Sequence, residues 1–279
     1  MTEQIENSPR MRRVIQTVCD FTRKPLNKCR IADLGSAHGQ ISLELARRGA
    51  SVLGIEGRDY WVDLANKNKL ALGLNNVEFL KDDIRNLTEE KYGKFDIIVC
   101  AGVLYHLDTP DVFILIENMH AMCTNFLIVD THVARQPNTQ TTWRGQTYSG
   151  WMYQEHAPGA DVSAKAAALG ASLSDEQSFW PSFPSLLNAL RHAGFSSVVQ
   201  SKIPLDNLYV NGEFKMHSDT VALLAMKGQP IQDYFGMTPG IGIDDWPEDP
   251  SRFYWQRSFH SPRDAECAND PITGTVSPA

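Results

Sequence analysis

The sequence lacks paired cysteine motifs, long apolar runs and an excess of basic charge, and each absence excludes a class of protein. Its 5 cysteines are odd in number and form no C-x-x-C pair, which argues against a disulfide framework and a structural zinc site. No run approaches the ~20 apolar residues of a membrane span, and the N-terminus resembles no export signal. With 26 basic and 33 acidic residues, the net charge of −7 gives no general attraction for nucleic acid. We expect a cytoplasmic protein without a membrane or nucleic-acid partner.

The spacing of apolar residues predicts the fold class. Residues 9–21 carry apolar side chains at helical spacing with arginines between them, which predicts an amphipathic lead-in helix within residues 1–28. From residue 29 to 131, short apolar runs alternate with helix-length segments, and two more strands are expected in 196–204 and 220–227. The predicted fold is therefore α/β, a doubly wound and mostly parallel seven-stranded sheet, with an insertion after strand five and a C-terminal extension.

The alternating pattern breaks down between residues 132 and 180. This stretch is polar, aromatic and rich in glycine, and it is longer than an ordinary connection, so we expect a loop that serves as a lid. Order returns in residues 183–193, where leucines mark one face of a helix and Gly194 fits its end. The core domain is thus expected to span residues 29–227, and residues 228–279 a partly irregular extension.

Chemically distinctive residues follow four successive predicted strands. The strongest motif is IADLGSAHG, residues 31–39, in which a buried strand ends in Asp33 and runs through glycines into a helix. The second strand ends in Glu56, where a carboxylate can accept hydrogen bonds from ribose hydroxyls. The third is followed by Asp83, and the fourth by a loop that contains His106. Because the carboxyl ends of parallel strands meet at one edge of a sheet, these side chains are expected to line one crevice.

The glycine loop, the acidic strand ends and the GVLYHL loop together resemble the class I S-adenosylmethionine (SAM) dependent methyltransferases, over about residues 30–131. GVLYHL and WPSFPSLLNALRHAGF are similar to small-molecule methyltransferases and to bacterial enzymes that finish a modified wobble uridine in tRNA. The resemblance implies SAM as the cofactor and S-adenosylhomocysteine (SAH) as its product. It places the amino-acid part of SAM against the glycine loop, the ribose on Glu56 and the adenine beside Asp83 and Ile84. The implied cofactor-binding residues are Asp33, Gly35, Ser36, Ala37, Gly39, Glu56, Gly57, Asp83, Ile84 and Ala101.

Ala37 departs from the family pattern, which has a glycine at this position. An alanine is acceptable there only with a negative φ, because its Cβ disfavours left-handed backbone, so we expect a negative φ at Ala37. An NAD-binding Rossmann domain is the nearest physical alternative. It prefers G-x-G-x-x-G, which this loop does not spell.

His106 and His156 are the candidate general bases. Methyl transfer requires alignment and, where the acceptor is protonated, a base such as imidazole. The alternative for His106 is that it only shapes the pocket. Tyr105 is expected to form a wall, because a phenol is a poor base at neutral pH. The candidate substrate-binding residues are Tyr105, Trp151, Tyr153, Glu155 and Trp180, and the alternative for the aromatic side chains of the insertion is a satellite core.

A metal-assisted mechanism would use Asp130 and His132. We expect these side chains to point to opposite faces of their strand, and we predict no metal.

The sequence therefore predicts a methyltransferase that acts on a small-molecule acceptor, at oxygen in preference to other atoms because a neutral histidine suits a hydroxyl. One alternative is a tRNA wobble-uridine modifying transferase, which would use the basic residues between Arg10 and Arg30 for phosphates. Another is a non-catalytic binding protein that has kept the fold. We expect a monomer or a homodimer.

Overall fold

A computed structural model describes residues 9–201, 209–210, 213–214 and 219–228. The chain divides into two units, Met1–Trp246 and Pro247–Ala279, and every described residue belongs to the first. The expected C-terminal extension beyond Gly228 lies outside the described residues.

Seven strands form the central sheet, in the order β3-β2-β1-β4-β5-β12-β9. The first five strands of the chain run parallel, whereas β12 is antiparallel to both β5 and β9. The prediction of a doubly wound, mostly parallel seven-stranded sheet is confirmed. A separate two-stranded pair is formed by β10 (Tyr209–Val210) and β11 (Glu213–Phe214). The central strands are β1 (Arg30–Leu34), β2 (Ser51–Glu56), β3 (Val77–Lys81), β4 (Phe95–Ala101), β5 (Cys123–His132), β9 (Ser197–Ser201) and β12 (Thr220–Met226).

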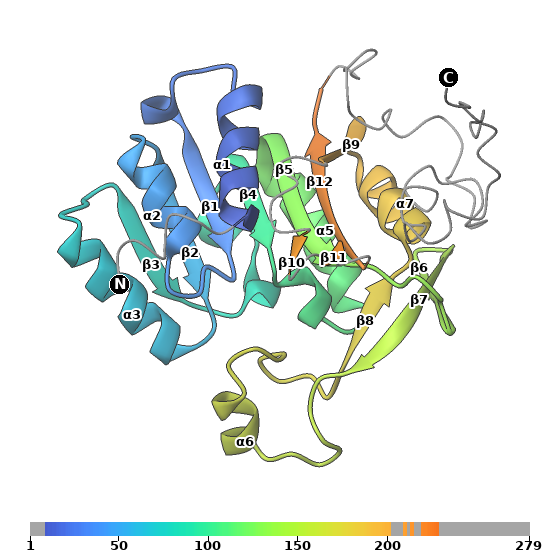
Figure 1. The fold of residues 1–279 in the computed structure, drawn as a ribbon. Coiled ribbons are helices and arrows are strands. Elements are labelled where there is room, and N and C mark those ends of the chain that lie inside the picture. The colour runs from blue at the N-terminus through green and yellow to red at the C-terminus, as the bar shows by residue number, and fades with distance from the viewer. Residues whose placement is uncertain (1–8, 202–208, 211–212, 215–218, 229–279) are drawn as a thin grey trace, which may run out of the picture. The chain divides into compact units, whose positions relative to one another are not determined.

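Helices cover both faces of this sheet (Figure 1). The lead-in helix α1 has the predicted bounds because its apolar stripe, which includes Val14 and Val18, is buried in the main core. The predicted helix before β9 is α7, which begins at the N-cap Ser182 and ends at Gly194 with a φ of 111°. Within the described ranges, every helix is too short or too polar to cross a bilayer. The helices are α1 (Pro9–Phe21), α2 (Gln40–Arg47), α3 (Asp59–Ala71), α4 (Glu89–Tyr92), α5 (Asp111–Met122), α6 (Val162–Ala167) and α7 (Phe183–Ala193), and the 3₁₀ turns are η2 (Leu26–Lys28), η3 (Ile84–Asn86) and η4 (Leu104–His106).

The strand order reverses at β1, which lies between β2 and β4. Asp33 of β1 pairs in register with Gly54 of β2 and Val99 of β4. The loops that follow these three strands therefore meet at the carboxyl edge of the sheet. Open α/β sheets bind their ligands at such a reversal.

The insertion between residues 132 and 180 is not the loop that we expected. It contains a three-stranded antiparallel sheet of β6 (Thr139–Trp143), β7 (Gln146–Gln154) and β8 (Gln177–Pro181), and α6 lies between β7 and β8. One face of this sheet packs on α5, with the rings of Tyr148 and Phe113 centred 4.5 Å apart. The other face presents Trp151 and Tyr153, which remain 39% and 38% exposed. The aromatic residues thus divide between a satellite core and an open face.

Candidate functional site

The loop after β1 passes so close to the loop after β4 that position 35 requires glycine. Gly35 has a φ of 65°, and a Cβ there would lie 2.7 Å from the Cβ of Val103. Its N–H donates to the carbonyl of Ile55 at 2.8 Å, which ties the loop to β2. At the other end of the loop, Gly39 has a φ of 83° and is the N-cap of α2. The glycine motif therefore shapes the floor of the crevice.

Ala37 adopts a φ of 46°, so the expectation of a negative φ was wrong. Its N–H donates to the Glu56 carboxylate, with 3.0 Å between the nitrogen and Oε2. This charge-assisted bond helps to hold the residue in the left-handed region, which costs an L-residue about 1–2 kcal/mol. Backbone strain of this kind is concentrated at functional sites.

We expect Ala37→Gly to raise the free energy of unfolding of the ligand-free protein by about 0.5–1 kcal/mol, because glycine adopts this φ without steric cost. Urea denaturation monitored by circular dichroism measures the change. Ala71→Gly, the same substitution at an exposed helical position, serves as the control and should lower stability. Equal losses in both variants would contradict the strain at Ala37.

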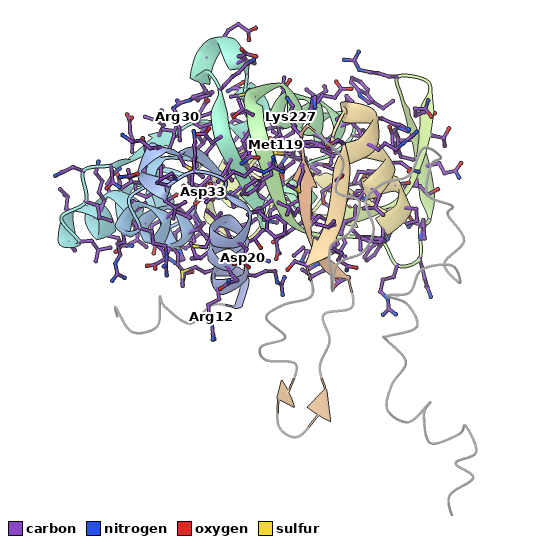
Figure 2. The ribbon with its side chains drawn as sticks, turned by 90° about the horizontal axis from the view of Figure 1, so that it is seen from above. Arg12, Asp20, Arg30, Asp33, Met119 and Lys227 are labelled. Atoms are coloured by element: carbon purple, nitrogen blue, oxygen red, sulfur yellow. The ribbon has the colours of Figure 1, made fainter. Side chains whose placement is uncertain are left out.

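Two buried carboxylates support the loop. Glu56 is 7% exposed, and its Oε1 accepts from the N–H of Arg58 at 3.0 Å. Asp33, labelled in Figure 2, is 2% exposed and accepts from the Ser42 hydroxyl at 2.6 Å. Burial raises the pKa of the Asp33 carboxyl to about 7, although the hydrogen bond from Ser42 opposes the rise. Asp33 thus links the end of β1 to α2 on the buried side of the loop.

A pocket lies above this loop, at the carboxyl ends of β1, β2 and β4. The histidine predicted at the end of β4, His106, lies in its wall. Among the predicted cofactor residues, its lining includes Gly35, Ala37, Glu56, Gly57, Asp83 and Ile84, and it does not include Asp33, Ser36, Gly39 or Ala101. The lining residues that the sequence did not indicate are Arg58, Trp61, Arg85, Gly102, Val103, Leu107, Leu169, Ala171, Ser172 and Leu173.

Part of the insertion closes this pocket. We call residues 157–175 the cap segment; residues 155 and 156 are tied to the β7–β8 sheet by hydrogen bonds from their N–H groups to the carbonyl of Glu176. Its Leu173 packs so closely on Gly57 that a Cβ at position 57 would lie 2.7 Å from the leucine. Arg85 joins the segment to the end of β3, because its guanidinium pairs with Asp83 at 2.6 Å and with Asp175 at 2.8 Å. Part of the insertion therefore forms one wall of the pocket that contains predicted cofactor residues, and its role as a lid stays a prediction.

Arg58 is the second link between the cap segment and the core. Its Nη2 lies between 3.0 and 3.5 Å from the backbone carbonyl oxygens of Lys165, Ala168, Ala171 and Ser172. Two N–H bonds are thus shared among acceptors that converge on one nitrogen. The Arg58 side chain thus stabilises the backbone of residues 165–172.

His106 and Glu155 form a hydrogen-bonded pair at the edge of the pocket. The distance from His106 Nδ1 to Glu155 Oε1 is 3.0 Å, and the Glu155 side chain is 1% exposed. Burial alone would raise the pKa of Glu155, but the hydrogen bond and charge of His106, with hydrogen bonds from Ser178 and Ser172, hold it below the usual value. Glu155 is therefore ionised at neutral pH and accepts the proton of Nδ1–H. The predicted role of Glu155 in substrate binding stays a prediction.

His156 occupies a different environment from His106. It is 7% exposed, it does not line the pocket, and its Nε2 lies 2.8 Å from the carbonyl oxygen of Ser172. Because a carbonyl only accepts, Nε2 carries the proton and is not available as a base. The catalytic role of His156 stays a prediction that its burial and its place outside the pocket lining do not support.

Rings extend from His106 towards the exposed face of β7. The ring of Tyr105 is centred 4.3 Å from that of His106 and 6.0 Å from that of Trp180. Trp180 stacks on Tyr153 at 4.6 Å and contacts Trp151 edge-on at 5.5 Å. Burial raises the pKa of Tyr105, which leaves less phenolate at neutral pH, and its place in a substrate wall stays a prediction. The predicted substrate residues, apart from Glu155, are thus one contiguous aromatic group.

Comparison with known proteins identifies the domain that supplies most of the pocket lining. Residues 31–125 match the family model described as a methyltransferase domain. These residues form a class I SAM-dependent methyltransferase domain. The chain is 28% identical over 81 residues to the ubiquinone biosynthesis O-methyltransferase of Acinetobacter baylyi. The aligned residues make up 29% of this chain and 34% of that protein. It is 32% identical over 81 residues to the enzyme of the same name from Hahella chejuensis, with the same coverage. The chain thus spans about a third of the length of these curated relatives.

Solved structures share the fold of the methyltransferase domain and of its surroundings. The N-terminal domain of EvdMO1, crystallised in the presence of SAH and D-fucose, is similar with a TM-score of 0.60 and 24% identity, over 79% of this chain and 84% of that one. Magnesium protoporphyrin IX methyltransferase from Synechocystis PCC 6803 with bound SAH has a TM-score of 0.51 and 18% identity, over 78% and 82% of the two chains.

Asp130 lies beside the methyltransferase domain's crevice, but its carboxylate is already bound. Arg10 Nε donates to one oxygen and Arg13 Nη1 to the other, both at 3.0 Å. The expectation that Asp130 and His132 point to opposite faces was wrong, because residues two apart on a strand share a face. His132 stacks on Trp180 at 4.7 Å. Among the described residues, no group of three or more His, Cys, Asp or Glu side chains could hold a metal ion.

The basic residues of the N-terminal region form contacts within the methyltransferase fold. In addition to the pairs on Asp130, Lys24 pairs with Asp96 at 2.6 Å, and the Arg30 guanidinium lies 3.9 Å from the centre of the Phe95 ring. Arg12 is exposed and points away from the sheet (Figure 2). The absence of a nucleic-acid partner stays a prediction.

Proposed function

We propose that the chain transfers the methyl group of SAM to a hydroxyl oxygen of a small-molecule acceptor. The observation that carries this proposal is the His106–Glu155 pair at the edge of the pocket. Nδ1 of His106 donates to the carboxylate, so Nε2 presents its lone pair as a proton acceptor. A neutral imidazole held in this way is suited to a hydroxyl acceptor.

The pocket residues fit the separate parts of SAM. Glu56 ends β2 and lines the pocket, where its carboxylate can accept hydrogen bonds from ribose hydroxyls. Asp83 and Ile84 lie beyond it and would border the adenine, and the loop that contains Gly35 would face the amino-acid part. When bound, SAM supplies a methyl group activated by a positively charged sulfur.

The protein side chains would then handle the proton of the acceptor. His106 takes this proton at Nε2, and Glu155 stabilises the resulting imidazolium through Nδ1–H. The cap segment excludes water from the pocket. Tyr105 and Trp180 provide ring surfaces beside His106 for an acceptor that carries apolar groups.

The names of the relatives support oxygen as the methylated atom, because the curated matches are O-methyltransferases of ubiquinone biosynthesis. The test is to incubate the protein with isotopically labelled SAM and a panel of phenols, sugars, amines and carboxylic acids, and to detect methylated products by mass spectrometry. We expect products methylated at hydroxyl oxygen. Transfer of the label to tRNA, but to no small molecule, would overturn the proposal.

Glu56→Ala is expected to weaken SAH binding by about 1–3 kcal/mol, because ribose hydroxyls lose their acceptor. Isothermal titration calorimetry measures this loss. Glu78→Gln, which alters an exposed carboxylate on β3, is the control and should bind SAH as the wild type does. Binding of NADH in place of SAH would refute the cofactor assignment.

A further inference from the structure

Ser172 of the cap segment lies where the pocket and the proposed base meet. It lines the pocket, and its N–H donates to Glu155 Oε2 at 2.8 Å. Its carbonyl oxygen accepts from His156 Nε2 at 2.8 Å and lies 3.1 Å from Arg58 Nη2. One residue of the cap segment therefore contacts the cofactor pocket, the partner of His106 and the arginine that holds the segment in place.

Glu155 is held from three sides. His106 Nδ1 lies 3.0 Å from Oε1, the Ser178 hydroxyl donates to the same oxygen at 2.7 Å, and the Ser172 N–H donates to the other. Ser178 belongs to β8, which is fixed in the three-stranded sheet. Ser172 belongs to the cap segment. If the cap segment moves away from the pocket, Glu155 loses one of its donors and gains access to water, and its grip on His106 weakens.

The pocket has to widen before it can hold a nucleoside, and the cap segment forms one of its walls. The pocket encloses about 130 Å³, whereas small-molecule sites measure roughly 300–1,000 Å³. Leu169, Ala171 and Leu173 form its wall on the side of the cap segment. The links that close this wall are Arg58 and Arg85, which follow β2 and β3 and line the same pocket. A ligand bound at these strand ends would therefore lie against Arg58 and Arg85, the two residues that also hold the cap segment in place.

We propose that Glu155 is a positioning residue that couples closure of the cap segment over the cofactor to alignment of His106. The inference rests on the proposed function, in which His106 is the base. It implies that the cofactor binds first and that the imidazole is held most firmly in its Nδ1–H form when the cap segment is closed. An acceptor that arrives before the cofactor meets a base that is not aligned.

The first test uses SAH and needs no acceptor. The Nδ1–H proton of His106 is followed by NMR in the full-length protein labelled with ¹⁵N-histidine. We expect a slowly exchanging Nδ1–H signal with saturating SAH and its loss without SAH. Glu155→Ala should lack the signal in both states, and Glu155→Asp should restore it in part. The Nδ1 signal of His192, which pairs with the Tyr148 hydroxyl at 2.8 Å, identifies a general loss of structure.

The second test measures the closure itself. Hydrogen exchange with mass spectrometry should show that SAH slows exchange in residues 157–175 by about tenfold or more, and leaves residues 139–150 of the β6–β7 hairpin unchanged. Arg58→Met keeps an unbranched side chain but has no N–H donor for the converging carbonyl oxygens, so it should reduce this protection and the His106 signal together.

The outcomes separate the two proposals. If calorimetry shows no SAH binding, the proposed function fails. If SAH binds and the His106 signal is equally strong with and without it, the coupling is overturned while the proposed base remains. If SAH protects the cap segment but Glu155→Ala keeps the signal, Glu155 is not the positioning residue.

Discussion

His106→Ala should lower the turnover rate by about 10²–10⁴-fold and leave the affinity for SAH nearly unchanged. General-base catalysis contributes a factor of this size, and the imidazole lies at the edge of the pocket, where it contacts Glu155. The wild-type rate should depend on pH through the general base, and this dependence should be absent in the variant. Initial rates with an acceptor found by the screen, together with calorimetry, measure both effects.

His156→Ala is the matched control, because His156 is a neighbouring histidine whose Nε2 donates to a backbone carbonyl. It should disturb the cap segment and reduce the rate less than His106→Ala. Near-normal turnover in His106→Ala would show that proximity alone drives the transfer, as expected for an acceptor that arrives already ionised. Loss of turnover in His156→Ala alone would place the base in the insertion.

Asp33 should make the ligand-free protein less stable as the pH rises from about 4 to 7. Burial raises the pKa of Asp33 to about 7 in the folded protein, whereas an unfolded aspartate titrates near 4. Between these values the folded state keeps a proton that the unfolded state releases, so the free energy of unfolding falls as the pH increases. A difference of about 3 pH units corresponds to about 4 kcal/mol. This contribution is complete below pH 4 and lost above pH 7.

Asp33→Asn cannot titrate, and its amide oxygen can still accept from the Ser42 hydroxyl. We therefore expect the variant to match the wild type near pH 4.5 and to exceed its free energy of unfolding by up to about 4 kcal/mol at pH 8. Urea denaturation at a series of pH values gives both curves. Asp63→Asn removes an exposed carboxylate from α3 as the control. Parallel curves for Asp33→Asn and the wild type would contradict the prediction.

The central sheet could be predicted from the sequence because its information is local. Each parallel strand is a short apolar run next to a helix with its own periodicity, and α7 carries its start and stop signals at Ser182 and Gly194. The insertion was harder to predict because its strands are stabilised by distant partners. Phe179 of β8 donates its N–H to the carbonyl of Leu107, and Tyr148 packs on Phe113. The spacing of apolar residues within 132–180 gives no signal of these contacts.

The residues of the site also divide into those with a local sequence signal and those that depend on distant partners. Glu56 and Gly35 were found because each stands at a fixed place after a strand. Arg58 was missed although it follows Glu56 by two residues, because its acceptors are backbone carbonyls more than 100 residues later. The pairing of His106 with Glu155 joins residues 49 apart and depends on how the insertion folds. The left-handed φ of Ala37 was missed because it is fixed by a bond to Glu56 on the neighbouring strand.

Arg58 holds the cap segment through backbone atoms, so the link does not depend on the side chains of that segment. Its acceptors at residues 165, 168, 171 and 172 are carbonyl oxygens, which every amino acid possesses. The side chains at exposed positions such as Val162 can therefore change without loss of the link, whereas a change at Arg58 removes the whole set at once. The surface over the pocket is free to vary in size and polarity on a constant support. Homologous chains could adapt this surface to new acceptors while the cofactor pocket beneath it stays the same.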